Sequence, residues 1–427
     1  MQNFEKIATS DLRKAGLLIA EAGLRAIDTE KVVREAVRVT DSALVLQGHE
    51  YLFAEAGRIF LYGVGKCSTE AVSALSAILG DRVTGGVLID VKEGNALPRI
   101  ISHRGTHPAP SEINVRAARH LAETLQGFQD NDLVIFCISG GASTLLCLPE
   151  GDMDCETESS IFRTLTKAGA TIQELNTVRK HLSRARGGHL ARLAYPARVH
   201  SLIFSDVPGD DIQFIASGPT VRDETTIEDA KKILLKYDVA QYVGRADIPL
   251  IETPKEEKYF DRVINEVLVS NKVALQAMAA QARELGYAAD IRTHELQGEA
   301  REVAKRILEE AREAPSKSVL LYGGETTVTI QGKGKGGRNM ELALSGLRFV
   351  SENECLISVA SDGRDNTDFA GGVCDIISRE KARAAGLDLG VFLRENNAYE
   401  FFGKVGDFII TGNTGSNVSD LIVAIKE

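Results

Sequence analysis

Two segments of the sequence combine glycines with cationic side chains, a combination that suits the binding of an anionic group. GVGK at residues 63–66 follows an apolar stretch, and GKGKGGR at residues 332–338 precedes a helical pattern. Glycine lets the backbone approach a ligand closely, and the N–H groups at the start of a helix attract anions. Lys66 is therefore a candidate anion-binding residue, and residues 332–338 are a candidate phosphate-binding loop.

Both segments also have other interpretations. GVGKCS could be a dinucleotide-binding turn with Asp90 as the ribose acceptor, although Ser68 stands where that fingerprint has its third glycine. It could also be a structural turn, and the loop at 332–338 could be a mobile hairpin connection. For this second loop we favour phosphate binding, because glycine pairs beside Arg338 exceed what a turn needs.

Two acidic groups follow apolar stretches that we predict to be strands. Asp206 and Asp210 lie in SDVPGDD, and Asp362 lies in SDGRDNTD. Phosphoryl transfer needs a divalent cation that bridges phosphate oxygens, and it often uses a carboxylate to orient the attacking hydroxyl. These aspartates could supply both functions, although aspartate is also a common helix cap and turn residue.

Serine and arginine side chains add further candidate ligands. SGGAS at residues 139–143 repeats the pattern of strand, glycine turn and helix. Because the sequence has no G-x-S-x-G motif, Ser139 and Ser143 suit a phosphate or hydroxyl ligand better than a nucleophilic role. The basic segment 179–192, which begins with Arg179, is either a solvated helix face or a site for a carboxylate or phosphate.

The elements that must position these residues alternate between strands and helices. This alternation predicts an α/β fold with a parallel or mostly parallel sheet covered on both faces. In such sheets ligands bind beyond the carboxyl ends of the strands, where the polar loops lie. Residues 317–339 are expected to form a β-hairpin around Gly323 and Gly324. Strand, loop and helix units are expected at 58–79, 131–146, 198–211, 353–365 and 407–425.

Length and composition limit the class of protein. The 427 residues allow two or three domains, and 44% hydrophobic residues can build a large core. A net charge of −10 argues against binding to duplex nucleic acid, and no segment reads as a membrane helix. The sequence also shows no secretory signal and no CxxC pair among its six cysteines. We therefore expect a cytoplasmic protein with reduced thiols and a small-molecule partner.

Long motifs with these features occur in both halves of the chain. They are GVGK (63–66), GTHPAPSE (105–112), SGGAS (139–143), NTVRKHLSRARGGHLA (176–191), SDVPGDDIQFIASGPTVRD (205–223), GGETTVTIQGKGKGGRNMELAL (323–344), SDGRDNTDFAGG (361–372) and TGNTGSNVSDL (411–421). In this order the chain resembles the class II glycerate 2-kinases, a MOFRL-type family once labelled hydroxypyruvate reductases. The resemblance implies phosphorylation of D-glycerate to 2-phosphoglycerate with ATP and Mg²⁺.

The resemblance also implies roles for individual residues. Asp362, together with Asp206 or Asp210, would position Mg²⁺, and an aspartate, for which we favour Asp206, would orient the 2-hydroxyl of glycerate. Which aspartate binds the metal and which orients the hydroxyl stays open. The residues that match the family's catalytic positions are Lys66, Asp206, Arg338 and Asp362. The expected substrate-binding residues are Ser139, Gly140, Gly141, Ser143, Arg179 and Asp210. The expected ATP-binding residues are Gly332, Lys333, Gly334, Lys335, Gly336, Gly337 and Asn339.

The family's architecture gives expectations about domains. It has a Rossmann-like domain with a parallel sheet and a second α/β domain with a mixed sheet, with the active site in the cleft between them. Because the N-terminal helices of such proteins pack with the second domain, we expect residues 45–243 to form the first domain. Residues 1–44 and 244–427 would form the second.

Two loops depart from the family pattern. No Gly-Pro pair precedes Thr367, and Asn413 and Ser416 stand where the family commonly has proline and threonine. These changes affect loops that would lie at the active site, so they leave the choice of acceptor open. The oligomeric state is open as well, and a homodimer is one of the alternatives.

Two other functions remain open at this point. An NAD(P)-dependent hydroxypyruvate reductase would use GVGK and Asp90, but it would explain neither the loop at 332–338 nor the acidic groups. A non-catalytic sensor of sugar phosphates could use the same glycine turns. The sequence has no recognisable effector or DNA-binding module that would favour a sensor.

Overall fold

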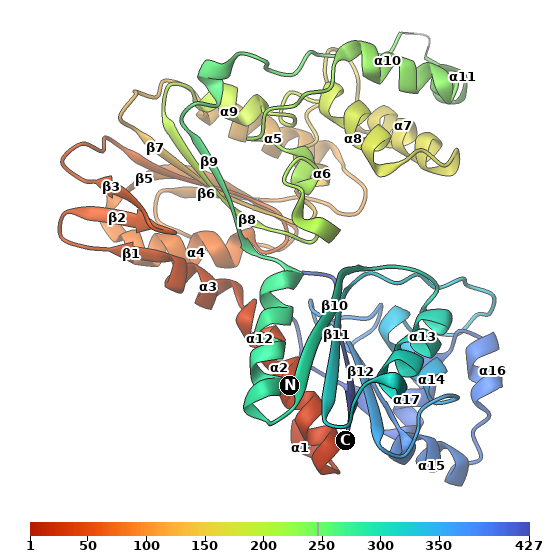
Figure 1. Cartoon of the computed structure of the whole chain (residues 1–427). Coiled ribbons are helices and arrows are strands. Elements are labelled where there is room, and N and C mark those ends of the chain that lie inside the picture. The colour runs from red at the N-terminus through yellow and green to blue at the C-terminus, as the bar shows by residue number, and fades with distance from the viewer. Residues whose placement is uncertain (95, 246) are drawn as a thin grey trace. The chain divides into compact units, whose positions relative to one another are not determined.

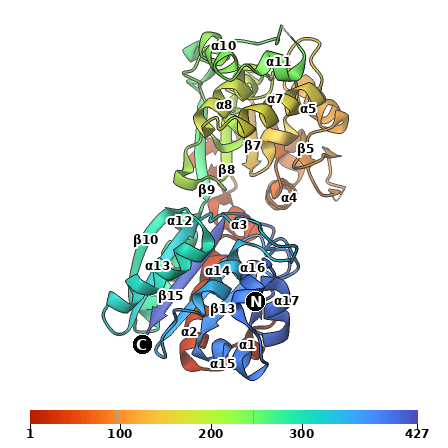
Figure 2. The same cartoon turned by 90° about the vertical axis from the view of Figure 1, so that its right-hand side faces the viewer.

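The computed structural model describes every residue except 95 and 246. The chain forms two compact units, one of residues 29–268 and one of residues 1–28 with 269–427 (Figures 1 and 2). Each unit is built around a six-stranded sheet with helices, which confirms the predicted α/β class.

The limits of these units differ from the domain boundaries expected after residues 44 and 243. The strand β9 (Val263–Val269) continues the sheet of the 29–268 unit, next to β8 (Arg198–Phe204). The helix α3 (Thr29–Ala36) also belongs to this unit. Of the N-terminal helices, α1 (Phe4–Ile7) and α2 (Asp11–Ala26) lie in the other unit. The division into domains at 45–243 itself stays a prediction.

The sheet of the 29–268 unit has the strand order β6-β5-β4-β7-β8-β9. The pairs from β6 to β8 are all parallel. Strands such as β7 are continuous apolar runs because helices cover both faces, with α4 on one face and α5 and α9 on the other (Figure 1). The other strands are β4 (Ile59–Val64), β5 (Val83–Asp90), β6 (Ile100–Arg104) and β7 (Leu133–Ser139).

A second, smaller core lies within the same unit. Ile161, Val178 and Leu234 are buried together where four helices meet, as Figures 1 and 2 both show for α7, α8, α10 and α11. A three-stranded antiparallel sheet, β1 (Val37–Val39), β2 (Ala43–Leu46) and β3 (His49–Leu52), completes the unit. The helices after α3 are α4 (Ser68–Leu79), α5 (Glu112–Thr124), α6 (Ala142–Leu145), α7 (Cys155–Lys167), α8 (Ile172–His181), α9 (His189–Ala194), α10 (Ile227–Lys236) and α11 (Val239–Val243).

The sheet of the other unit is mixed, with the order β10-β11-β15-β12-β13-β14. Only β10 and β11 pair in parallel; the other four pairs between the described strands of this sheet are antiparallel. The helix α2 is anchored by Arg13, which is fully buried and forms ion pairs with Asp375 and Asp407 at 2.5 and 2.9 Å. The strands are β10 (Ala288–Leu296), β11 (Ser318–Gly324), β12 (Glu354–Ala360), β13 (Gly371–Asp375), β14 (Phe408–Ile409) and β15 (Asp420–Lys426).

Helices cover this mixed sheet on both faces. Gly16 of α2 faces the sheet so closely that a Cβ there would lie 2.8 Å from Ile357 Cδ1. On the opposite face, Ile307 of α13, Leu342 of α14 and Phe402 of α17 share one core with Ile422 of β15. The helices after α2 are α12 (Asn271–Glu284), α13 (Ala300–Glu313), α14 (Arg338–Gly346), α15 (Ile376–Ala384), α16 (Leu389–Arg394) and α17 (Ala398–Val405).

The predicted hairpin over residues 317–339 is wrong. The strand β11 ends at Gly324 and lies inside the sheet, between β10 and β15. The described segment 325–337 contains no strand and runs directly into α14. Gly324 has a φ of +148°, and a Cβ there would lie 2.3 Å from the Leu296 nitrogen. The glycine at position 324 therefore permits a close approach of β11 to β10, and it does not mark a turn.

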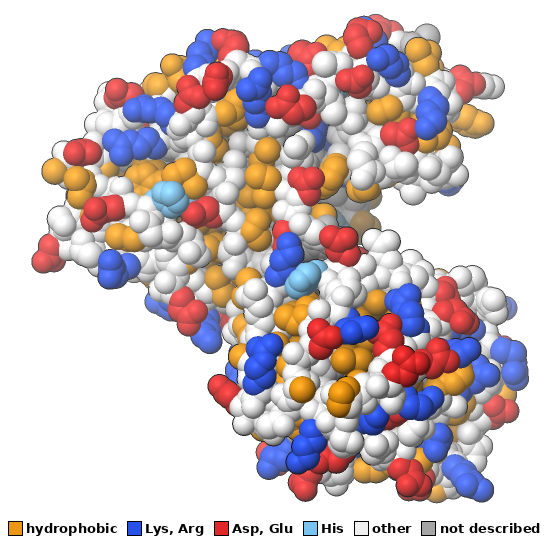
Figure 3. Space-filling view, viewed as in Figure 1, with side chains coloured by type: hydrophobic (Ala, Val, Ile, Leu, Met, Phe, Trp, Pro, Cys, Tyr) orange, Lys and Arg blue, Asp and Glu red, His pale blue; other side chains and the backbone are white. Residues whose placement is uncertain are grey.

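Two expectations about the environment can be compared with the structure. All six cysteines are buried, and none of them forms a disulfide in the structure. Within the described residues, none of the helices has both the length and the apolar character that crossing a bilayer requires. On the face drawn in Figure 3, positive and negative side chains are interspersed and do not form one basic patch.

Candidate active site

Three candidate loops of the 29–268 unit meet at one edge of its sheet. They follow β4, β7 and β8, which are neighbours and run parallel, so their carboxyl ends lie together. The backbone N–H of Lys66 donates to the carbonyl of Gly140 at 3.0 Å. The N–H of Cys67 donates to Ser139 Oγ at 3.3 Å. These contacts hold the GVGK turn against the SGGAS loop.

Two glycines make this close approach possible. Gly65 has a φ of +127°, and a Cβ there would lie 2.0 Å from Ser139 Oγ. A Cβ on Gly140 would lie 2.0 Å from Asp206 Oδ2. The Asp206 carboxylate therefore lies directly against the SGGAS backbone. The structure thus brings Lys66, Ser139, Gly140 and Asp206 together, as the sequence predicted for strand-end loops.

Lys66 and His107 lie together over Gly141. Measured from the position that a Cβ of Gly141 would take, Lys66 Cγ and His107 Cδ2 are both 3.2 Å away. Burial and the neighbouring Lys66 lower the pKa of His107 to about 4, so its ring is neutral near pH 7. Among the described residues no carboxylate is paired with Lys66. Its ammonium therefore supplies the positive charge beside the SGGAS loop. Sequence reasoning missed His107, although it lies within the GTHPAPSE motif.

Ser143, Arg179 and Asp210 occupy different surroundings in the same unit. Ser143 Oγ and Ser217 Oγ are 3.1 Å apart and share a hydrogen bond. The Arg179 guanidinium lies 4.5 Å from the centre of the Phe162 ring. Asp210 ends a short 3₁₀ turn with a φ of +57°. Ser143 and Arg179 both line one cavity of this unit.

The basic segment 179–192 is largely buried, so it is not a solvated face. Lys180, His181, Arg186 and His189 are each at most 3% exposed. Lys180 forms an ion pair with Asp223 at 3.1 Å, which compensates part of the cost of burying the charge. The spacing of basic residues could not reveal these partners, because they come from distant parts of the chain.

In the other unit, the glycine-rich loop packs against the segment between α16 and α17. A Cβ on Gly332 would lie 2.2 Å from Glu395 Cα, and one on Gly334 would lie 2.4 Å from Asn397 Cβ. The N–H of Gly334 donates to the Glu395 carbonyl at 2.8 Å. Gly332 and Gly334 are therefore required because a larger side chain would clash with residues 395–397. The sequence alone could not show this reason for the glycines, because the contacting residues are remote in the chain.

Several backbone N–H groups of this loop already have acceptors within the chain. The N–H of Gly332 donates to Asn396 Oδ1 at 3.0 Å, and that of Lys335 donates to Asn397 Oδ1 at 3.2 Å. The side chains of Lys333 and Lys335 are exposed, and neither is paired with a described carboxylate. The lysine side chains are thus better placed to meet phosphate than these amides are.

Arg338 is held by two carboxylates. Its Nε lies 2.6 Å from Asp420 Oδ2, and its Nη1 lies 2.5 Å from Glu325 Oε1. Burial opposes the charge of Arg338, but Asp420 and Glu325 raise its pKa overall. Asn339 is 1% exposed and donates to Asp420 Oδ1 at 2.7 Å. Both residues thus have internal partners, and their contacts with a phosphate stay a prediction.

The N-terminus of α14 is occupied by the carboxylate of Asp365. The N–H groups of Asn339 and Met340 donate to it at 3.1 and 2.8 Å. Burial raises the pKa of Asp365 to about 7 despite these hydrogen bonds. Asp362, three residues earlier, is partly exposed and accepts a hydrogen bond from the Arg364 N–H at 2.9 Å. Of these two aspartates, Asp362 is therefore the more accessible to a ligand.

Asp90, the ribose acceptor of the dinucleotide interpretation, has a structural role. It is 1% exposed, and its Oδ2 accepts hydrogen bonds from the N–H and Oγ1 of Thr69 at 3.0 and 2.7 Å. Its Oδ1 accepts from the Val91 N–H at 2.6 Å. The carboxylate thus stabilises the start of α4 and has little capacity left for a ribose.

A parallel α/β unit with a lysine among glycine turns at its strand ends is typical of proteins that act on small anionic ligands.

Comparison with known proteins shows which family of such proteins the chain resembles. Residues 16–247 match a family described as Domain of unknown function (DUF4147), and residues 318–420 match the MOFRL family. The glycerate 2-kinase of Pyrococcus horikoshii is 39% identical over 97% of each chain. The D-glycerate 2-kinase of Thermotoga maritima is 34% identical and covers 97% of this chain and 98% of its own.

Solved structures agree with these relatives. The crystal structure of the Thermotoga maritima glycerate kinase superposes with a TM-score of 0.85 at 32% identity, covering 97% of this chain and 99% of that one. A crystal structure of a Pyrococcus horikoshii protein gives a TM-score of 0.82 at 38% identity, with 98% and 99% covered. The chain belongs to the glycerate 2-kinase family, as its motifs predicted.

Proposed function

We propose that this protein is an ATP-dependent kinase that phosphorylates the 2-hydroxyl of D-glycerate, giving 2-phosphoglycerate and ADP. The observation that carries the proposal is the 39% identity, over 97% of both chains, with a protein named glycerate 2-kinase. The clustering of Lys66, Ser139 and Asp206 at the strand ends supports it, because a kinase needs cations and a carboxylate at one site.

In the proposed reaction the 2-hydroxyl oxygen attacks the terminal phosphorus of ATP. The bond from that phosphorus to the bridging oxygen breaks, ADP leaves, and the hydroxyl proton passes to a base. Asp206 is the proposed base, held in place against Gly140. The Lys66 ammonium, beside the neutral His107, is proposed to stabilise the negative charge of the transferred group.

The chemistry that Mg²⁺ would supply when bound is positive charge that offsets the negative charge of the phosphate groups. The described residues contain no group of three or more histidine, cysteine, aspartate or glutamate side chains arranged to hold a metal ion. Mg²⁺ commonly takes only one or two protein carboxylates and completes its coordination with water and phosphate. Asp206 in the 29–268 unit and Asp362 in the other unit each have the oxygen donors that suit this coordination, and we propose each of them as a candidate ligand.

We propose that the ATP phosphates are held in the other unit by the loop at 332–338. The exposed ammonium groups of Lys333 and Lys335 support this role, since neither is paired with a described carboxylate. Arg338 would reach the phosphates while it remains paired with Asp420. A cytoplasmic location and a homodimer stay predictions from the sequence.

The experiment that tests the proposal is phosphorus NMR of the product formed from D-glycerate and Mg-ATP. We expect the signal of 2-phosphoglycerate together with ADP. A 3-phosphoglycerate signal would overturn the position of transfer, and no ADP would overturn the kinase activity.

The reductase alternative deserves a parallel assay, because two Agrobacterium vitis relatives, each 37% identical over 86% of this chain, carry hydroxypyruvate reductase as a provisional name. Incubation with hydroxypyruvate and NADH or NADPH, without ATP, should leave the cofactor unoxidised. The internal hydrogen bonds of Asp90 support this expectation.

A further inference from the structure

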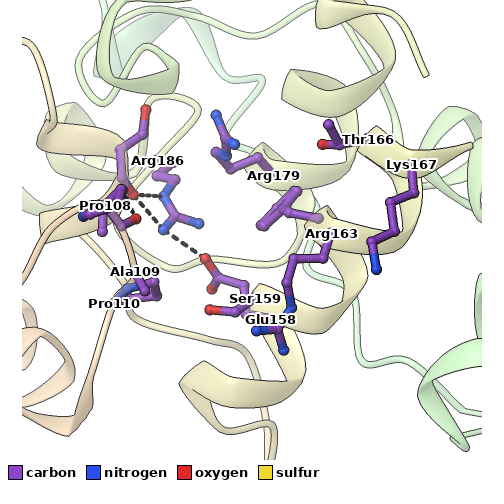
Figure 4. A pocket seen from close by; sticks show the side chains of 13 residues that line it. Pro108, Ala109, Pro110, Glu158, Ser159, Arg163, Thr166, Lys167, Arg179 and Arg186 are labelled. Carbon is purple, nitrogen blue, oxygen red and sulfur yellow. Dashed lines mark hydrogen bonds and ion pairs between the residues drawn. The ribbon is translucent and has the colours of Figure 1, made fainter. Parts of the chain in front are cut away.

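A cavity of about 450 Å³ lies in the 29–268 unit beside the SGGAS loop (Figure 4). Its walls come from α7, from α8, from the loop at 108–110 and from Ser143 and Thr144. This volume lies within the range of about 300–1,000 Å³ that is typical of small-molecule sites. The cavity is therefore large enough for a small organic ligand.

The lining of the cavity has an excess of positive charge. Its four cationic residues are Arg163, Lys167, Arg179 and Arg186, whereas Glu158 is its one carboxylate. Arg163 also pairs with the exposed Glu156 at 2.7 Å, so its charge is partly compensated outside the cavity. The remaining charge favours an anionic ligand.

Arg186 gives the most specific indication of what that ligand contacts. The residue is 1% exposed, and its Nε and Nη2 donate to the Ser143 carbonyl at 3.0 and 2.6 Å. Its Nη2 also lies 2.8 Å from Glu158 Oε1. The third nitrogen, Nη1, has no hydrogen-bond partner among the described residues. In Figure 4 this nitrogen carries no dashed line and points toward the middle of the cavity. A buried guanidinium N–H without an acceptor is costly, and an anionic oxygen would remove that cost.

Arg179 faces the same space. Its guanidinium stacks on Phe162, and no described carboxylate is paired with it. Burial and the nearby Arg186 charge lower the pKa of Arg179 to about 10. An anion that lies beside Arg179 and Arg186 would favour the charged form of Arg179 and form charged hydrogen bonds with both side chains.

The position of the cavity links it to the proposed reaction. Ser143, whose carbonyl orients Arg186, ends the SGGAS loop that contacts Lys66 and Asp206. Pro108, in the cavity wall, directly follows His107, which lies beside Lys66. A ligand in the cavity therefore lies next to the loop where phosphoryl transfer is proposed.

We propose that this cavity binds the acceptor through its carboxylate, with Arg179 and Nη1 of Arg186 as the donors. The inference rests on the proposed kinase function, and it places the carboxylate of the proposed acceptor in this cavity. Glu158 is a positioning residue that holds Arg186. Because the cavity exceeds the needs of a three-carbon acid, carboxylates with longer polar chains also fit.

The test is calorimetric binding of D-glycerate to the full chain without nucleotide. Arg179→Gln should weaken binding by about tenfold to a hundredfold, since it removes a charged hydrogen-bond donor. Arg348→Gln is the matched control: Arg348 also stacks on a phenylalanine, Phe349, at 5.5 Å, but lies in the other unit and outside this cavity. It should change binding by less than about threefold. Arg179→Lys should restore part of the affinity.

Steady-state kinetics separate this inference from the proposed function. Arg179→Gln should raise KM for D-glycerate much more than it lowers kcat. If the wild type phosphorylates D-glycerate but Arg179→Gln leaves binding and KM unchanged, the carboxylate assignment is wrong and the kinase function stands. If glycerate binding depends on Arg179 but the wild type forms no phosphoglycerate, the kinase proposal fails and the cavity assignment stands.

Two further measurements cover the remaining outcomes. Inorganic phosphate is tested as a competitor, and tighter binding of phosphate than of D-glycerate in this cavity would contradict a carboxylate site.

If Arg179→Gln does not fold, the wild type is treated with phenylglyoxal, which modifies arginine. D-glycerate should then protect Arg179 and leave Arg348 unprotected, as peptide mass spectrometry would show; equal labelling of Arg179 with and without glycerate would overturn the inference.

Discussion

The glycine turns of the 29–268 unit and the glycine-rich loop of the other unit look alike in sequence, but their contacts differ. In the first, Gly65 and Gly140 bring Ser139 and Asp206 into contact with the turns, and no described carboxylate pairs with Lys66. In the second, Gly332 and Gly334 pack against the segment at 395–397. Arg338 there is paired with two carboxylates.

Glycine and a nearby cation are therefore not sufficient evidence for a phosphate site. A cation without a carboxylate partner can attract an anionic ligand with its full charge. A cation that is paired with a carboxylate attracts a ligand less strongly, because the carboxylate neutralises part of its charge. We therefore expect a substitution of Lys66 to lower turnover without changing stability. A substitution of Arg338 should lower both turnover and stability.

The largest effect should come from Lys66→Ala. Removing a cation that stabilises the transferred phosphoryl group should lower kcat by about 10²–10³-fold. The melting temperature should change little, because no described carboxylate loses a partner. Turnover is measured with D-glycerate and Mg-ATP, and melting by circular dichroism. Near wild-type turnover in both Lys66→Ala and Arg338→Ala would show that the catalytic assignment is wrong.

The next effect should come from Gly140→Ala. The added Cβ would lie 2.0 Å from Asp206 Oδ2, so the carboxylate must move, and we expect kcat to fall by about 10–100-fold. Gly403→Ala is the matched control, because a Cβ there meets nothing within 4 Å. Its turnover should equal that of the wild type. Equal turnover in both variants would mean that the position of Asp206 does not matter for the reaction.

Arg338→Ala should lower stability by about 2–4 kcal/mol, since it leaves the buried Asp420, which is 1% exposed, without its cation. Thermal melting should show a shift of about 5–10 °C. Glu325→Gln, which removes the more exposed partner, should cost less than about 1 kcal/mol. If Arg338→Ala has the same melting temperature as the wild type, the ion pairs of Arg338 do not stabilise the fold, and the proposed difference between the two loops is wrong.

The smallest effect concerns the pH dependence of stability in the 332–338 region. In the folded chain the pKa of Asp365 is about 7, well above its ordinary value of 3.8. Between those values the folded state keeps a proton that the unfolded state has released, so stability falls as pH rises from about 4 to 7. From pH 5 to 8 the wild type should lose about 2–3 kcal/mol relative to Asp365→Asn, because the pKa of Asp365 lies about two pH units above pH 5 and each unit corresponds to about 1.4 kcal/mol. Circular dichroism melts at both pH values test this, and parallel pH curves would contradict it.

Local patterns were sufficient to predict the strand-end loops at 63–66, 139–143 and 205–211. Each follows an apolar run and begins with residues that favour a turn, so neighbouring residues alone indicate it. The hairpin expected around Gly323 and Gly324 failed because glycine marks both turns and close backbone approaches. Which of the two applies depended on β10, which packs beside β11.

For the candidate site too, local patterns indicated the residues in strand-end loops but not those brought together by contacts between remote segments. Lys66 and Asp206 could be named as candidates because they lie in loops that directly follow predicted strands. Glu158, Phe162 and Arg186 were missed as a group, since no spacing in the sequence connects α7 to the segment after α8. Asp365 was visible in SDGRDNTD, but its place at the start of α14 depends on a contact between residues about 26 positions apart.

Residue types and short spacings are sufficient to establish the alternation of strands and helices, the order of the motifs and the family to which the chain belongs. They do not show which cations have carboxylate partners. Pairing depends on distances between side chains that are remote in the sequence, and those distances exist only once the sheets have assembled. That is why Lys66 and Arg338, so similar in their local sequence, lie in such different electrostatic surroundings.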